Sequence, residues 1–477
     1  MSVEKQTLTA LKWTSLAKLA GQIVSWGVTL VVLRLLLPAD YGLMAIVSMI
    51  ITVLVSIAEL GLGVSLVQAP KLERDDLSIV TGAVILLNVC IGVVVALLAP
   101  LAAWFYSEPR LTLLIQSASL HFLFGALGTV PQALAYRDMN FKWLAWVELA
   151  AVVTGGLATL GLAWHGYGVW ALLLGSLFQN FVRTALLLRK GTPLPVFRLQ
   201  GLRRHLTFGG TFTIARLITQ MVYQADIFIG GRILTQQALG LYSVSLHLAT
   251  LPMQKIMGVI NQVALPAVAR LQDDRARLRL RLLEAIRLLI VFSLPMLWGL
   301  SAVAPEFVAT IMGPKWEEAV LPLQAVCLVI PMRMLNATFN TVSVGVGDMQ
   351  VNLINTAASS VVLPVSFYVG AHWGVNGLAF AWVFAIPFMF FFILPRTLRI
   401  VDLRVADLVT CLRVPVAAGA VMYLAVSLTR WGCEGLAPAA RLPLLVVLGA
   451  AAYIGSALLL DRKIIPDVLR VVRGMRT

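Results

Sequence analysis

Charged residues are unusually scarce in this 477-residue chain. Charged residues make up 12% of the sequence, hydrophobic residues make up 60%, and the mean hydropathy is +0.90. A soluble domain is about a quarter charged, so this chain carries roughly half the usual amount. Such a composition is typical of a protein built mostly from membrane-spanning helices. The apolar runs are long and continuous rather than short and alternating, which argues against a transmembrane β-barrel.

Reactive residues and catalytic motifs are also scarce. The four cysteines form no CxxC pair, and the five histidines show no metal-ligand spacing. The sequence contains no phosphate-binding P-loop and no nucleophile elbow. We therefore expect no metal, no cofactor, no catalytic residue and no direct use of ATP. These absences predict that the chain is not an enzyme.

The chain is rich in apolar runs of roughly 20 residues, and each run is long enough to span a bilayer. They predict an all-α integral membrane protein with about fourteen transmembrane helices. The spans are expected near residues 11–37, 40–68, 77–100, 111–134, 142–164, 167–189, 206–233, 238–266, 281–304, 318–341, 350–371, 374–397, 406–429 and 442–461. The tenth is the least defined, because residues 305–316 before it suit a loop or a half-helix.

The basic residues explain the net charge of +15. Lys and Arg gather in the alternate loops that lie on the same side as both termini, and this bias predicts that both termini are cytoplasmic. The basic loops then face anionic lipid, so the membrane is a partner and nucleic acid is not.

A stretch near the start of the chain recurs in its middle. KLAGQIVSWGVTLVVLRLLLPADYGLM begins at position 18 and RLITQMVYQADIFIGGRILTQQALGLY begins at position 216, an offset of 198 residues. The offset places Lys18 on Arg216, Gln22 on Gln220 and Gly42 on Gly240. It predicts an internal duplication of two six-helix lobes that run in the same direction, related by an axis along the membrane normal. The expected parts are an N-terminal lobe (1–190), a cytoplasmic linker (191–205), a second lobe (206–400), and two extra helices with a basic cytoplasmic tail (401–477).

Cations and amides recur at helical spacing inside four of the apolar spans. A charge at the centre of a spanning helix costs about 2.5–3.5 kcal/mol on insertion scales, so each needs a reason. Two interpretations remain open: the polar faces line a water-filled cationic cavity between the lobes, or they hydrogen-bond between packed helices. The candidate cavity residues are Lys18, Gln22, Arg216, Gln220, Tyr223, Lys255, Gln262, Arg333, Asn336 and Asn340.

Acidic residues in the spans are fewer. Glu59 is either a titrating coupling group or an ion-pair partner of Lys18, and Asp226 suits a pair with Arg216 or Lys255. A cavity lined by cations suits an anion such as a diphosphate or an acidic sugar, which charge-assisted hydrogen bonds would hold. The amides suit sugar hydroxyls.

Several strings resemble a known family. They are LRLLLPADYGLMAIV after the first span, AELGLGVSLVQ at the end of the second, AYRDMNFKWLAWVE before the fifth, and GGRILTQQALGLYSVSLHLATLP across the seventh and eighth. The chain resembles bacterial polysaccharide exporters close to the colanic-acid-type lipid-linked oligosaccharide flippases, within the multidrug/oligosaccharidyl-lipid/polysaccharide flippase superfamily.

The resemblance implies a flippase of the bacterial inner membrane. Such a protein moves undecaprenyl-diphosphate-linked oligosaccharide repeat units to the periplasmic leaflet for exopolysaccharide or lipopolysaccharide biosynthesis, by alternating access around a central cavity. It implies the polyprenyl-diphosphate-linked oligosaccharide as the substrate and the polysaccharide polymerase machinery as a further partner. Related flippases place cations for the diphosphate on the first and eighth helices, where Lys18 and Lys255 lie in this chain.

Two alternatives belong to other classes. A cation-coupled multidrug antiporter of the same fold would need an acidic, aromatic pocket, whereas cations outnumber acids inside these spans. A glycan polymerase or ligase would have a large outer loop with paired Arg or His residues, and no outer loop of that size is expected.

Overall fold

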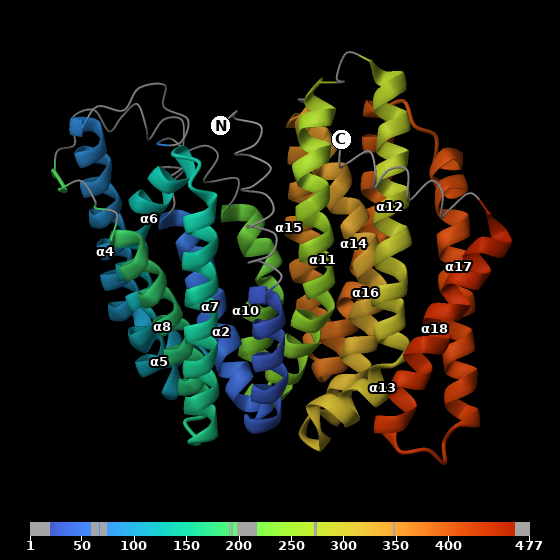
Figure 1. The fold of residues 1–477 in the computed structure, drawn as a ribbon, viewed down its shortest axis with the longest axis horizontal. Helices are drawn as coiled ribbons and strands as arrows, with labels where there is room; N and C mark the ends of the chain where they lie inside the picture. The colour runs from blue at the N-terminus through green and yellow to red at the C-terminus, as the bar shows by residue number, and fades with distance from the viewer. Residues whose placement is uncertain are drawn as a thin grey trace. The chain divides into compact units, whose positions relative to one another are not determined.

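The computed structural model describes residues 20–58, 66, 74–189, 191, 194–197, 217–270, 274–346 and 349–462. All regular elements within these ranges are helices, in agreement with the all-α prediction (Figure 1). The chain divides into two compact units, Met1–Gly240 and Leu241–Thr477. Each unit is considered separately.

Among the described residues, the first unit holds the apolar helix Ala20–Leu35, a helix over 217–223, and eight further elements that include the start of α11. These elements are α2 (Pro38–Ala58), α4 (Arg74–Phe105), α5 (Arg110–Ala118), α6 (Leu120–Arg137), α7 (Phe141–Trp164), α8 (Val169–Leu188), α10 (Ala225–Ile233) and α11 (Gln236–Arg270). Helices α5 and α6 share the single span expected at 111–134 and are separated at Ser119, whose hydroxyl donates to the Gln116 carbonyl at 2.6 Å.

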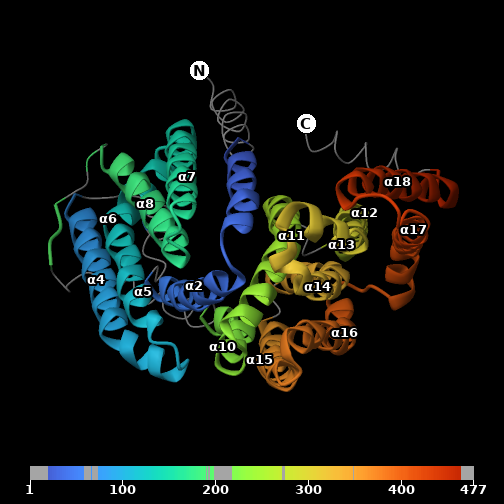
Figure 2. The same ribbon diagram turned by 90° about the horizontal axis from the view of Figure 1, so that it is seen from below.

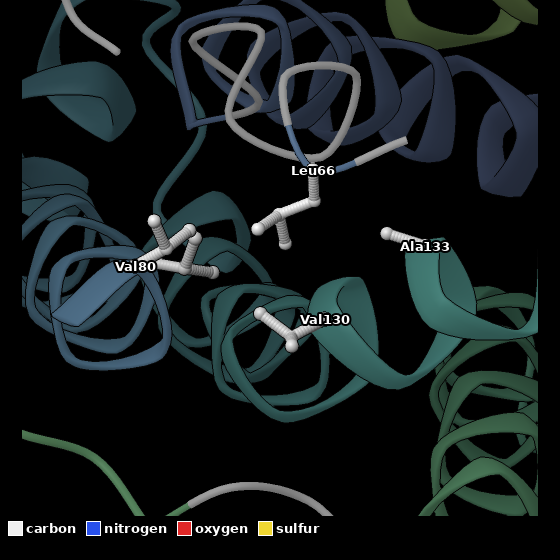
Figure 3. Packing of buried hydrophobic residues seen from close by; sticks show 5 residues of the cluster. Leu66, Val80, Val130 and Ala133 are labelled. Carbon is white, nitrogen blue, oxygen red and sulfur yellow. The ribbon is translucent and has the colours of Figure 1, made fainter. Parts of the chain in front are cut away.

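Apolar and small residues hold the first unit together. Leu66, Val80, Val84, Val130 and Ala133 form a cluster between α4 and α6 (Figure 3). Elsewhere in the unit, glycines on α7 and α8 let these two helices pack closely, as is common inside membranes, where the hydrophobic effect does not drive helices together.

The start of α2 crosses the start of α11, and two glycines meet at the crossing. A Cβ atom on Gly42 would overlap the carbonyl oxygen of Gln236, and a Cβ atom on Gly240 would overlap the carbonyl oxygen of Pro38. Figure 2 shows α2 beside α10, the helix that precedes α11. No residue larger than glycine fits at either position without moving a backbone.

The second unit contains the rest of α11 and nine further elements. They are α12 (Arg275–Ala302), α13 (Ala304–Phe307), the π-helix η1 (Val308–Met312), the 3₁₀-helix η2 (Pro314–Ala319), α14 (Val320–Val346), α15 (Met349–Ala371), α16 (Gly374–Ile400), α17 (Val405–Gly432) and α18 (Pro438–Leu460). The spans on α14 and α16 are each 61% buried, against 44% or less for the other spans of this unit, so these two helices form its centre.

Ion pairs attach α17 and α18 to the rest of the second unit. Arg279 on α12 contacts Asp407 in the first turn of α17 at 2.6 Å, and Arg287 contacts Asp461 after α18 at 2.5 Å. At the other end of α17, Arg430 contacts Glu306 of α13 at 3.0 Å. The two extra helices are therefore held to α12 and α13 at both ends.

Eleven helices among the described residues are long and apolar enough to cross a membrane. They coincide with the second to sixth and the ninth to fourteenth expected spans. The first expected span falls on the shorter helix Ala20–Leu35, the seventh on 217–223 together with α10, and the eighth on α11. The multi-pass architecture is confirmed, while the total of fourteen spans stays a prediction.

Candidate functional site

A polar face runs along α14 through the centre of the second unit. It consists of Arg333, Asn336 and Asn340, which lie three and four residues apart and so share one side of the helix. Asn336 is 8% exposed, and the side-chain oxygens of Asn336 and Asn340 are buried with no hydrogen-bond partner among the described residues. An amide oxygen without a partner inside an apolar helix bundle costs about 1–3 kcal/mol, so this face is suited to accept hydrogen bonds from water or a ligand.

The Arg333 side chain stacks on the indole of Trp382. The guanidinium carbon lies 4.6 Å from the ring centroid, within the range of a cation–π interaction. Trp382, on α16, is 1% exposed, and its indole N–H donates to the hydroxyl of Tyr242 on α11 at 2.6 Å. The ring of Phe367, on α15, lies 4.8 Å from the Trp382 ring. Three helices therefore fix the surface on which the Arg333 side chain lies.

A third buried amide belongs to the same unit. Asn355 on α15 is 1% exposed, and neither its side-chain oxygen nor its side-chain nitrogen has a hydrogen-bond partner among the described residues. Buried polar groups in folded proteins nearly always have partners. Arg333 and the three amides of Asn336, Asn340 and Asn355 thus lie within apolar helices of the second unit, a combination that suits a ligand carrying both an anionic group and hydroxyls.

The first unit places three of the candidate residues on two helices. Gln22 is half-buried on the helix Ala20–Leu35, while Gln220 is half-buried and Tyr223 is 37% exposed on the helix over 217–223. Each of the three residues lies on a helix, as the sequence predicts.

Asp226 has a structural contact that the sequence analysis did not consider. It lies in the first turn of α10, is fully buried, and accepts the backbone N–H of Ile227 at 2.8 Å. A carboxylate at the N-terminus of a helix interacts favourably with the helix dipole. The side chain therefore helps α10 to begin at this position.

The remaining candidates lie outside the described residues. They are Lys18, Glu59 and Arg216, together with the side chains of Lys255 and Gln262, for which only the helical backbone of α11 is described. The predicted ion pairs of Glu59 and Asp226 with these cations therefore stay predictions.

One ion pair between two helices escaped the sequence analysis although a signal for it existed. Arg183 on α8 contacts Glu148 on α7 at 2.6 Å. Glu148 lies near the start of α7 and Arg183 near the end of α8, so the antiparallel connection of these two consecutive helices was enough to indicate the pair. Trp382 and Tyr242 gave no comparable signal, because they are 140 positions apart and neither belongs to a polar pattern.

The family model for polysaccharide biosynthesis proteins matches residues 31–321. The chain belongs to this family. Among its curated relatives is the lipopolysaccharide biosynthesis protein WzxC of Escherichia coli K12, which is 27% identical over 69% of this chain and 68% of the relative. Another is the teichuronic acid biosynthesis protein TuaB of Bacillus subtilis, which is 25% identical over 83% of each chain.

The fold of this polysaccharide biosynthesis protein is shared with a solved transporter. The structure of the lipid II flippase MurJ in an inward closed conformation aligns with a TM-score of 0.75, at 14% identity, over 95% of this chain and 99% of that one. Together with the family match, this confirms the resemblance found in the sequence. The chain is a multi-pass membrane protein of the polysaccharide biosynthesis family with a flippase-type transporter fold.

Proposed function

We propose that this protein is a flippase that carries undecaprenyl-diphosphate-linked oligosaccharide repeat units from the cytoplasmic to the periplasmic leaflet of the bacterial inner membrane. The repeat units would supply exopolysaccharide or lipopolysaccharide synthesis, with polysaccharide polymerase machinery downstream. Both termini would be cytoplasmic, and the two lobes predicted from the duplication would alternate around a cationic cavity. Lys18, Arg216 and Lys255 would add their charges to that of Arg333 in binding the diphosphate.

The polar face of α14 is the observation that carries this proposal. A cation within an apolar helix is expensive, and membrane proteins keep such residues where they bind substrate or ions. Arg333 offers a planar set of N–H donors that matches phosphate oxygens, and Asn336 and Asn340 offer amides to hydroxyl groups. One helix face thus presents the two kinds of group that a sugar diphosphate needs.

The relatives add independent support. WzxC is named for lipopolysaccharide biosynthesis, TuaB for teichuronic acid biosynthesis, and MurJ for flipping lipid II.

Deletion of the gene followed by extraction of lipid-linked intermediates tests the function. We expect a diphosphate-linked repeat unit to accumulate in the cytoplasmic leaflet, because synthesis continues while translocation stops. Unchanged lipid pools together with altered drug tolerance would instead favour the multidrug antiporter.

A substitution tests the role of the α14 face. Arg333→Ala should reduce export by about tenfold or more at equal membrane abundance, since a charge-assisted hydrogen bond contributes about 1.5–3 kcal/mol. Arg396→Ala is the matched control, because Arg396 also stacks on an aromatic ring (Phe392, at 4.0 Å) but lies half-buried near the end of α16 and not on the α14 face. Equal export by both variants would contradict a role for Arg333 in the site.

A further inference from the structure

Three charged side chains form a group where α13, α17 and α18 meet. Glu306 is buried, and the side chains of Arg430 and Arg441 are largely buried. Arg430 Nε lies 3.0 and 3.3 Å from the two carboxylate oxygens of Glu306, whereas Arg441 Nη1 reaches the same carboxylate at 3.5 Å. The carboxylate is therefore bound mainly by Arg430, and Arg441 is the less closely paired of the two arginines.

The group carries one positive charge that its carboxylate does not balance. Arg441 Nη2 donates to the carbonyl oxygens of Glu434 and Leu436 at 3.0 and 2.7 Å, which are neutral acceptors. Nε of Arg441 and Nη2 of Arg430 are buried and have no hydrogen-bond partner among the described residues. Because a buried cation without a counter-charge is costly, the group is suited to one further anion.

A cavity of about 530 Å³ lies beside this group. Glu306 and Arg441 line it, together with small residues and prolines that include Ala309, Gly313 and Pro438. Helix α18 begins at Pro438, so the positive end of its dipole also borders the cavity. The volume is that of a pocket for an organic ligand and exceeds the space that a single small ion needs, which indicates a larger molecule with an anionic group.

The cavity lies at the depth of lipid headgroups. Trp431, next to Arg430, is exposed at the end of α17, and exposed tryptophans of this kind mark the interface between membrane and water. The spans on α17 and α18 are 28% and 22% buried, so both helices present most of their surface to lipid. Lipids beside these two helices therefore have their phosphates at the level of the arginine group.

We propose that this cavity is a binding site for the phosphodiester headgroup of a phospholipid, in the leaflet that the predicted orientation makes periplasmic. A phosphodiester carries one negative charge, which equals the charge left on the arginines, and its oxygens accept charge-assisted hydrogen bonds from a guanidinium. Glu317, exposed at the same cavity, can accept a hydrogen bond from a hydroxyl or amino group of the headgroup.

This site goes beyond the proposed flippase activity and does not depend on it. Val320, which lines the cavity at the start of α14, precedes Arg333 on the same helix by thirteen residues, or about 20 Å. A lipid bound at the cavity would hold α13 and α18 together, because its phosphate would supply the missing counter-charge.

The experiment measures the melting temperature of the delipidated full-length protein in detergent during a titration with short-chain phosphatidylethanolamine. The lipid should raise the melting temperature of the wild type, whereas diacylglycerol, which lacks the phosphate, and inorganic phosphate at the same concentration should not. Arg441→Gln should weaken lipid binding by about tenfold, because a charge-assisted hydrogen bond is lost. Arg399→Gln, which removes an exposed cation at the end of α16, is the matched control and should bind like the wild type.

A second variant leaves both arginines in place. Ala309 is exposed and lines the cavity, so Ala309→Trp fills the space without changing the charged group. It should abolish the stabilisation by lipid and keep the wild-type melting temperature in the absence of lipid. This variant decides the question if Arg441→Gln does not fold.

Three results would overturn the proposal. Lipid might leave the melting temperature of the wild type unchanged, or it might stabilise the wild type, Arg441→Gln and Ala309→Trp equally; either result would contradict a site in this cavity. Stabilisation by inorganic phosphate that equals that by the lipid would identify a free phosphate as the ligand and contradict the assignment of a headgroup.

Discussion

Glu306 shows how single charged residues stabilise the second unit. Its side chain is 3% exposed and contacts Arg430 of α17 at 3.0 Å and Arg441 of α18 at 3.5 Å. The side chains of both arginines are largely buried and share this one carboxylate, so the three residues join α13, α17 and α18.

Neutralising Glu306 tests this group. Glu306→Gln keeps the shape of the side chain but leaves two arginines without their counter-charge, and breaking a buried ion pair in this way costs about 3–5 kcal/mol. We expect the apparent melting temperature of the protein in detergent to fall by several degrees. Glu317→Gln, an exposed position that lines the same cavity as Glu306, should leave it unchanged. An equal melting temperature for both variants would contradict the structural role of Glu306.

Residue spacing predicted part of the candidate site and missed the rest for a physical reason. The pattern of Arg333, Asn336 and Asn340 is local, so a helical period reveals it. The ring on which Arg333 stacks is that of Trp382, 49 positions further on, and contacts between distant helices leave no period in the sequence. Trp382 is one of many apolar residues in its spanning helix, so the sequence does not single it out as part of the site.

At the scale of elements, the sequence predicted where the helical pattern is interrupted before α14 but not which structure the interruption has. Residues 305–316 were expected to form a loop or a half-helix. The structure places α13, the π-helix η1 and the 3₁₀-helix η2 there in succession. The break lies at Gly313, whose φ of +95° only glycine adopts without strain, followed by Pro314.

The crossing of α2 and α11 makes a prediction about two glycines. Gly42→Ala and Gly240→Ala should each destabilise the protein, because the added Cβ atom overlaps a backbone carbonyl and overpacking costs about 1–3 kcal/mol. Gly27→Ala and Gly161→Ala, at helical positions with no neighbouring atom within 4 Å, should be neutral or stabilising by about 0.5–1 kcal/mol. Melting temperatures of the four purified variants check this. If all four melt alike, the crossing is not as tight as described.

At the scale of the whole molecule, composition and hydropathy predicted the class of fold and the order of the helices. Eleven of the expected spans match apolar helices long enough to cross a membrane, because burial in lipid imposes a length and a composition that a sequence displays directly. The expected division into two six-helix lobes, with a linker over 191–205, stays a prediction. Long-range ion pairs such as Arg279–Asp407 were not predicted, since many basic residues near the membrane surface are equivalent in the sequence.

The orientation in the membrane is testable at the two ends of α7. Met139 and His165 are both exposed, on either side of a single span. With the four native cysteines replaced by alanine, His165→Cys should react with a membrane-impermeant maleimide in intact cells. Met139→Cys should react only after permeabilisation, because Arg137 and Lys142 beside it mark the cytoplasmic side. The opposite labelling pattern would reverse the predicted orientation.

The crossing of α2 and α11 at Gly42 and Gly240 also bears on how such a chain arose. The offset of 198 residues in the predicted duplication places Pro38 on Gln236 as well as Gly42 on Gly240. Position 42 of the first copy meets the equivalent of position 38 in the second, and position 38 of the first meets the equivalent of position 42. Such reciprocal contact is the mark of an isologous interface in a two-fold homodimer. Two pairs of residues in one polypeptide thus touch in the way that two identical half-length subunits would touch across a shared axis.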